Sequence, residues 1–172
     1  MRSTLKSLFC AALTAVATCL TMTSCESVDD ERIPPVGVNV QFVNIGDWHT
    51  YGVAGAGQYR IFRKTDRLPA GYPYKVSEYT GYGGLLLTCD PNGEYLVYDL
   101  SCPVEVKPDV RIAVDTENEM AGIAVCHKCG SRYNLYGYGA PISGKALDLN
   151  YGLQKYRVAV GNPSAPYAVI SR

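Results

Sequence analysis

Short apolar segments separated by turn residues make up most of the chain from Val36 onward. No window in this region repeats its hydrophobic residues with the 3.6-residue period of a helix, and the apolar segments are rich in β-branched and aromatic residues. Ten segments have the length and composition of β-strands: 38–45, 58–63, 74–79, 84–90, 94–101, 111–114, 122–125, 131–136, 153–160 and 166–171. The pattern therefore predicts one all-β domain over residues 36–172.

A turn sequence, Asp90-Pro91-Asn92-Gly93, joins two of these segments. Asn-Gly adopts positive φ at little cost, so the segments 84–90 and 94–101 are predicted to form a hairpin. The 17 glycines and 14 tyrosines suit short, half-buried strands with tight connections. No repeat of fixed period occurs, and 172 residues leave no room for a second domain of similar size.

The N-terminal 24 residues have the layout of a secretory signal peptide. Arg2 and Lys6 precede an apolar stretch of 15 residues, and small residues follow up to Cys25. A membrane-spanning helix needs about 20 apolar residues, so this stretch is expected to be removed rather than retained as a span.

The residues Met22-Thr23-Ser24-Cys25 resemble the lipobox of bacterial lipoproteins, in which cleavage occurs before the cysteine and its thiol carries diacylglycerol. The resemblance implies that Cys25 is the lipid attachment site of an outer membrane lipoprotein, on the periplasmic or cell-surface face. Residues 25–35, which are acidic and end in two prolines, are then expected to be a tether. The alternative is ordinary cleavage nearby, which leaves Cys25 as a free cysteine.

The charge of the chain is balanced, with 16 basic and 16 acidic residues. Without residues 1–24 the chain would carry 14 basic and 16 acidic residues. Neither balance favours a nucleic acid partner. The expected partners are the membrane, through the lipid anchor, and an unidentified protein or redox partner.

Four cysteines remain after Cys25, namely Cys89, Cys102, Cys126 and Cys129. Cys102 lies in the sequence Cys-Pro-Val-Glu after one predicted strand, and Cys126 and Cys129 lie in Cys-His-Lys-Cys-Gly after another. A Cys-x-x-Cys-Gly loop resembles a zinc or iron knuckle, whose backbone amides stabilise thiolates. Cys89, inside an apolar segment, is predicted to be a core residue of its strand.

The order of these motifs resembles the Rieske iron-sulfur family. The matching residues are Asp99, Cys102, Pro103, Cys126, Gly130, Tyr133, Gly144-Lys145-Ala146, Leu149 and Tyr156-Arg157-Val158. The match covers about half of the chain beyond Cys25. It looks especially like the Rieske-like lipoproteins of Bacteroidetes, with Cys-Pro-x-Glu and Cys-x-x-Cys-Gly-Ser-x-Tyr. The resemblance implies an antiparallel β-sandwich in which residues 102–140 form a small subdomain of two metal-binding loops.

The resemblance also assigns roles to individual residues. Cys102 and Cys126 fall on the two family cysteines that hold one iron, whereas Val104 and Cys129 fall on the two family histidines. Val104 has no ligand atom, so the usual set of two cysteines and two histidines is incomplete. His127 occupies a spacer position in its loop and is expected to point outward.

Three states of the site follow from this ligand set. A [2Fe-2S] cluster would use Cys102, Cys126 and Cys129 with a fourth ligand from Cys89 or Glu105. Zinc would be held by the same three cysteines and Glu105. Without a metal, Cys102 would form a disulfide with Cys126 or Cys129.

These states imply two functions, namely electron transfer through the cluster or a non-redox binding module with zinc, a disulfide or an empty site. No catalytic motif accompanies the cysteines. A thioredoxin-like Cys-x-x-Cys opens a helix, whereas residues 131–136 are predicted to be a strand, so the protein is not expected to be an enzyme.

Overall fold

The computed structural model describes residues 27–117 and 122–172. The predicted signal peptide, residues 1–24, and the predicted lipid attachment site, Cys25, lie outside the described residues. Within them most of the regular secondary structure is β-strand and the helices are few and short, which confirms the all-β prediction. The strands are β1 (Val38–Phe42), β2 (Tyr59–Phe62), β3 (Tyr79–Thr80), β4 (Leu85–Cys89), β5 (Tyr95–Asp99), β6 (Ala113–Val114), β7 (Ile123–Val125), β8 (Arg132–Asn134), β9 (Ala140–Ser143), β10 (Lys155–Val160) and β11 (Ala168–Ser171).

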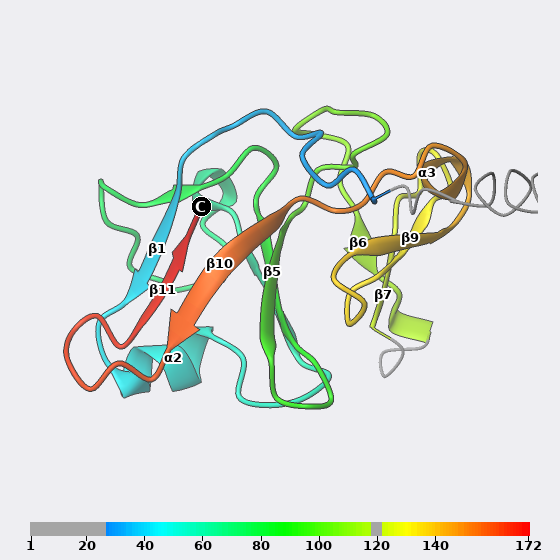
Figure 1. Cartoon of the computed structure of the whole chain (residues 1–172). Coiled ribbons are helices and arrows are strands. Elements are labelled where there is room, and N and C mark those ends of the chain that lie inside the picture. The colour runs from blue at the N-terminus through cyan, green and yellow to red at the C-terminus, as the bar shows by residue number, and fades with distance from the viewer. Residues whose placement is uncertain (1–26, 118–121) are drawn as a thin grey trace, which may run out of the picture.

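Seven of these strands form one antiparallel sheet in the order β2-β4-β5-β10-β11-β1-β3 (Figure 1). Lys64, which follows β2, donates its backbone N–H to Thr80 Oγ1 in β3 at 3.3 Å. The first and last strands of the order therefore approach each other, and the sheet curls into a nearly closed barrel. Phe42, Trp48, Phe62 and Tyr72 form edge-to-face ring contacts in its apolar interior.

Strand β4 is buried along its whole length because it has a core on each face. Leu85, Leu87 and Cys89 face the interior of the large sheet, and Leu86 faces a second apolar cluster outside it. Side chains of successive strand residues point to opposite faces, so a strand between two cores must be apolar throughout. This explains why the segment Leu-Leu-Leu-Thr-Cys lacks the usual polar alternation.

The other four strands form a small antiparallel sheet in the order β6-β7-β8-β9, which lies beyond β5 in Figure 1. Tyr133 and Leu135 from this part of the chain pack with Leu86 and Tyr98 of the large sheet in the second cluster. The buried Tyr98 hydroxyl donates to the Leu135 carbonyl at 2.6 Å. The small sheet therefore packs against the outer face of β4 and β5.

Short helices appear where the apolar pattern predicts none. α2 (Ile45–Tyr51) starts inside the segment predicted as a strand over 38–45, because Asn44 caps it and accepts a hydrogen bond from the Asp47 N–H at 2.9 Å. α3 (Lys145–Asp148) and the 3-10 helix η2 (Lys64–Asp66) are short connections. No helix in the described part of the chain has both the length and the apolar character needed to cross a membrane.

Part of the segment expected to be a tether contacts the domain. Asp29 pairs with Tyr151 in an isolated parallel bridge, and Asp30 forms an ion pair with Lys155 at 3.2 Å. Ile33 is only 2% exposed. The described residues after Ser27 therefore lie against the domain up to Ile33, and the chain enters β1 five residues later.

Candidate metal centre

The first cysteine loop follows β5 and begins at Cys102. The Cys102 N–H donates to the Val110 carbonyl at 2.9 Å, and the Val106 N–H donates back to the Cys102 carbonyl at 2.9 Å. Val106 has φ of 50°, in the left-handed region that β-branched residues rarely adopt. The loop is thus a tight turn whose fifth residue reverses the chain.

Asp99 holds the base of this loop in place. It is fully buried, and its carboxylate accepts hydrogen bonds from four donors. They are the N–H groups of Tyr82 at 2.9 Å, Gly83 at 3.0 Å and Ser101 at 2.8 Å, and the Tyr156 hydroxyl at 3.0 Å. A buried carboxylate is stabilised only when such donors surround it, so Asp99 ties the turn before β4, the first cysteine loop and β10 into one unit.

The second cysteine loop connects β7 to β8. The Cys126 N–H donates to the Ser131 carbonyl at 2.9 Å, and the Gly130 N–H donates to the Cys126 carbonyl at 2.8 Å. Gly130 has φ of 70°, which glycine adopts without steric cost. The loop therefore has the tight turn that its Cys-x-x-Cys-Gly sequence predicts.

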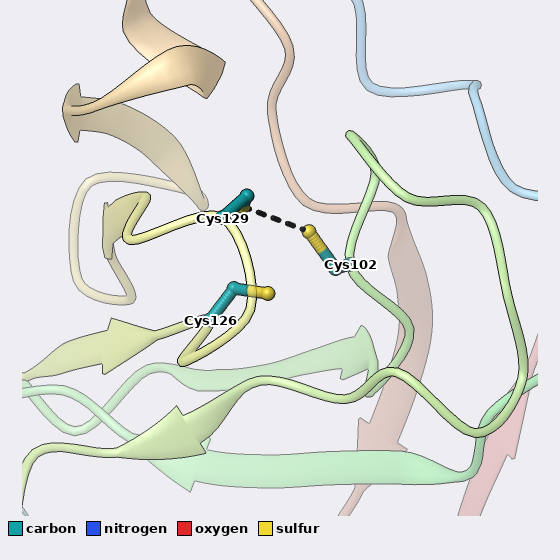
Figure 2. Close-up of side chains that lie close together, drawn as sticks. All are labelled: Cys102, Cys126 and Cys129. Carbon is teal, nitrogen blue, oxygen red and sulfur yellow. Dashed lines mark hydrogen bonds between the residues drawn. The ribbon is translucent and has the colours of Figure 1, made fainter.

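The two loops bring three sulfurs together (Figure 2). The Sγ atoms of Cys102, Cys126 and Cys129 all lie within 4.8 Å of one another, and those of Cys102 and Cys129 are 3.5 Å apart. A tetrahedral ion with metal–sulfur bonds of about 2.3 Å places its sulfur ligands about 3.8 Å from each other. The spacing of the three thiols is therefore close to that of ligands on one ion.

All three cysteines are free thiols in this structure. The 3.5 Å between the Cys102 and Cys129 sulfurs is well above the length of a disulfide bond, about 2.05 Å. The predicted meeting of the three cysteines is present, but no covalent bond joins them.

The surroundings of the three thiols differ. Burial raises the pKa of Cys102 to about 12, although the backbone amides of Glu105 and Val104 act in the opposite direction. Burial also acts to raise the pKa of Cys129, but hydrogen bonds with the Ser131 side chain and backbone and with the thiols of Cys102 and Cys126 together outweigh it, so that this pKa lies below its ordinary value. Cys129 is partly exposed, whereas Cys102 and Cys126 have no exposed surface.

Two hydroxyl groups contact the sulfurs. Ser131 Oγ lies 3.2 Å from Cys129 Sγ, and it accepts a hydrogen bond from the Ala146 N–H of α3 at 2.9 Å. The Tyr133 hydroxyl lies 3.7 Å from Cys102 Sγ. Because the backbone of α3 orients the Ser131 hydroxyl, the short helix that follows β9 is part of the site although it carries no ligand atom.

The remaining predicted site residues have different positions. Glu105 forms an ion pair with Lys128 of the second loop, with 3.1 Å between Oε2 and Nζ, and its carboxylate is absent from the cluster of thiols. Cys89 is buried in the interior of the large sheet, as expected for a core residue, and is absent from the cluster of thiols. Val104 packs against the apolar cluster beside the site, and His127 is exposed.

Two features of the site were not predicted from the sequence. The first is the ion pair of Glu105 and Lys128, which the opposite charges in the two loops could have suggested. The second is the hydrogen bond of Tyr156 to Asp99, two residues that are distant in the chain and that no local pattern connects.

No protein-family model matches the chain, and no curated protein matches it. The likeness to the Rieske family therefore rests on the order of residues in the sequence, and the site must be interpreted from its own geometry.

Proposed function

We propose that Cys102, Cys126 and Cys129 bind a single thiophilic metal ion, and that the protein is a lipid-anchored envelope module which this ion stabilises. The observation that carries the proposal is the convergence of three sulfurs, from two separate loops, at distances that suit one tetrahedral ion. Zinc is the expected ion because it combines tetrahedral geometry with thiolate ligands and needs no redox chemistry. The role is binding and structure rather than catalysis.

The spacing of the sulfurs favours one ion over a [2Fe-2S] cluster. In the ligand set that the Rieske resemblance implies, Cys102 and Cys129 would bind different irons. Two irons and their bridging sulfides must then fit between these residues, whereas their sulfurs are only 3.5 Å apart. A single ion needs no rearrangement of this size.

Electron transfer through a [2Fe-2S] cluster is the second candidate, because hydroxyl groups accompany the sulfurs. Ser131 lies beside Cys129 and Tyr133 beside Cys102, and hydrogen bonds to ligand sulfurs tune the reduction potential of such clusters. This candidate requires Cys129 to move away from Cys102 when the cluster forms.

The metal content of the full-length protein tests the proposal. We expect protein purified anaerobically in detergent to contain about one zinc ion per chain and to be colourless. A content of two irons per chain, with absorption in the visible range, would show that the site holds the cluster and not a single ion. If the protein, with its thiols reduced, binds neither added zinc nor added cobalt, the proposed metal site is wrong.

The anchor is proposed independently of the metal. Cys25 belongs to the residues that the structure does not describe, and its role rests on the lipobox resemblance. We expect Cys25→Ser to move the protein from the membrane fraction to the soluble fraction of cells, because several buried acyl chains at about 0.8 kcal/mol per methylene are lost. Cys19→Ser, within the apolar stretch, is the matched control and should leave the protein in the membrane fraction. If Cys25→Ser remains there as well, Cys25 is not the anchor.

A further inference from the structure

The two cysteine loops repeat the same backbone geometry. In each loop the cysteine N–H donates across the base of the turn, to Val110 in the first loop and to Ser131 in the second, at 2.9 Å in both. In each loop the cysteine carbonyl accepts from the N–H four residues later, at 2.9 Å in the first and 2.8 Å in the second. The two turns can therefore be compared residue by residue.

The comparison pairs Cys102 with Cys126 and Glu105 with Cys129. The residues after this second pair, Val106 and Gly130, both have a left-handed backbone, with φ of 50° and 70°. A valine is strained in this conformation, whereas a glycine is not. The first loop thus keeps the geometry of a Cys-x-x-Cys-Gly turn although its sequence lacks the glycine, and it carries a carboxylate where that turn carries its second ligand.

The Glu105 side chain already reaches the second loop. Its Oε2 atom pairs with Nζ of Lys128, which stands between the two cysteines of that loop, at 3.1 Å. Within the described part of the chain, the carboxylate forms its ion pair through Oε2, which leaves the Oε1 atom available. The side chain is 20% exposed, so it lies at the rim of the site and is not buried in the core. Its carboxylate does not belong to the group of ligand atoms that lie within 4.8 Å of one another, so it must turn from Lys128 toward the sulfurs when the ion binds.

We infer that Glu105 is the fourth protein ligand of the metal ion, at the position that corresponds to Cys129; this inference rests on the proposed single-ion site. Carboxylate oxygen is a regular zinc ligand beside thiolate sulfur. Lys128 offsets part of the negative charge that three thiolates and a carboxylate bring to a divalent ion. Four protein ligands leave no open coordination position, which makes the site a structural one.

The test uses full-length protein in detergent, with Co²⁺ as a visible probe of coordination and with competition against a chelator to measure affinity. Glu105→Gln should retain the fold, weaken metal affinity at least tenfold and change the cobalt spectrum. Glu105→Cys should bind more tightly and show stronger sulfur-to-cobalt charge transfer, because it completes a four-sulfur site.

Lys128→Gln is the matched control, because it removes the ion pair and leaves the carboxylate. It should keep the wild-type cobalt spectrum and change the affinity less than threefold. If Glu105→Gln binds one ion with wild-type affinity and spectrum, or if Lys128→Gln weakens binding as much, Glu105 is not a ligand and the three-cysteine site stands without it. If the wild-type protein binds no metal, the proposed function itself fails.

Discussion

Cys102→Ala is expected to abolish metal binding and to lower the melting temperature of the metal-loaded protein by about 5–10 °C. Cys102 is the only cysteine that the first loop contributes, so without it both sulfur ligands of the ion come from the second loop. The first loop then retains no thiolate for the ion, and the bond that joins the two loops through sulfur is lost. Metal at about 100 times its dissociation constant stabilises a folded protein by about 2.7 kcal/mol. In a chain of this size each kcal/mol corresponds to about 2–4 °C.

Cys89→Ala is the matched control for this prediction. Both cysteines are buried, with exposed fractions of 2% for Cys89 and 0% for Cys102, but Cys89 lies in the interior of the large sheet. The control should lose some stability from the small cavity and should retain one metal ion per chain. Calorimetry with and without a chelator separates the two effects. Equal melting temperatures of wild type and Cys102→Ala in the presence of zinc would show that no ion links the loops.

The same site should lose its metal as the pH falls. In the metal-free protein burial raises the pKa of Cys102 to about 12, so this thiol is protonated at neutral pH. The ion must displace that proton to bind sulfur, and protons therefore compete more effectively at lower pH. The apparent metal affinity of wild-type protein should decrease steadily when it is titrated from alkaline to neutral pH.

Asp99→Asn is expected to destabilise the protein by about 3 kcal/mol or more, because each hydrogen bond to a buried charged group contributes about 1.5–3 kcal/mol. The wild-type carboxylate accepts from four donors and is fully buried. An asparagine keeps only one acceptor oxygen. Its NH₂ group, a donor, would face either the two N–H groups of Gly83 and Ser101 or the Tyr82 N–H and the Tyr156 hydroxyl, depending on its orientation. The midpoint of urea unfolding should fall without a change in slope.

Tyr156→Phe provides a graded comparison for Asp99→Asn. It removes one of the four donors and leaves the three backbone N–H groups in place. The expected loss is about 1–2 kcal/mol, the usual cost of leaving one buried acceptor position without its partner. If Asp99→Asn is no more destabilising than Tyr156→Phe, the carboxylate does not hold the base of the first loop.

Most of the strands could be predicted because their signals are local. The prediction of a strand over 74–79 was wrong, since only Tyr79 of that segment lies in a strand. The apolar segments over 84–90 and 94–101 and the turn at Asp90–Gly93 form the β4–β5 hairpin, in which Gly93 has φ of 88°. β9 was missed because its sequence, Ala-Pro-Ile-Ser, is short and contains proline. α2 was missed because it is short, and its Asn44 cap follows an apolar strand without a break in composition.

The sequence by itself determined the class of the fold and the two turns that carry cysteine, because strand alternation and tight turns depend on residues within a few positions of each other. It also identified the three cysteines as candidates for a common site. Only the tertiary structure decided that their sulfurs meet at single-ion distances and that Glu105 points to Lys128 of the other loop. These distances depend on how the small sheet packs on β4 and β5, through side chains such as Tyr98 and Tyr133 that are far apart in the chain. No local pattern encodes that packing, because it is the sum of many contacts between distant segments.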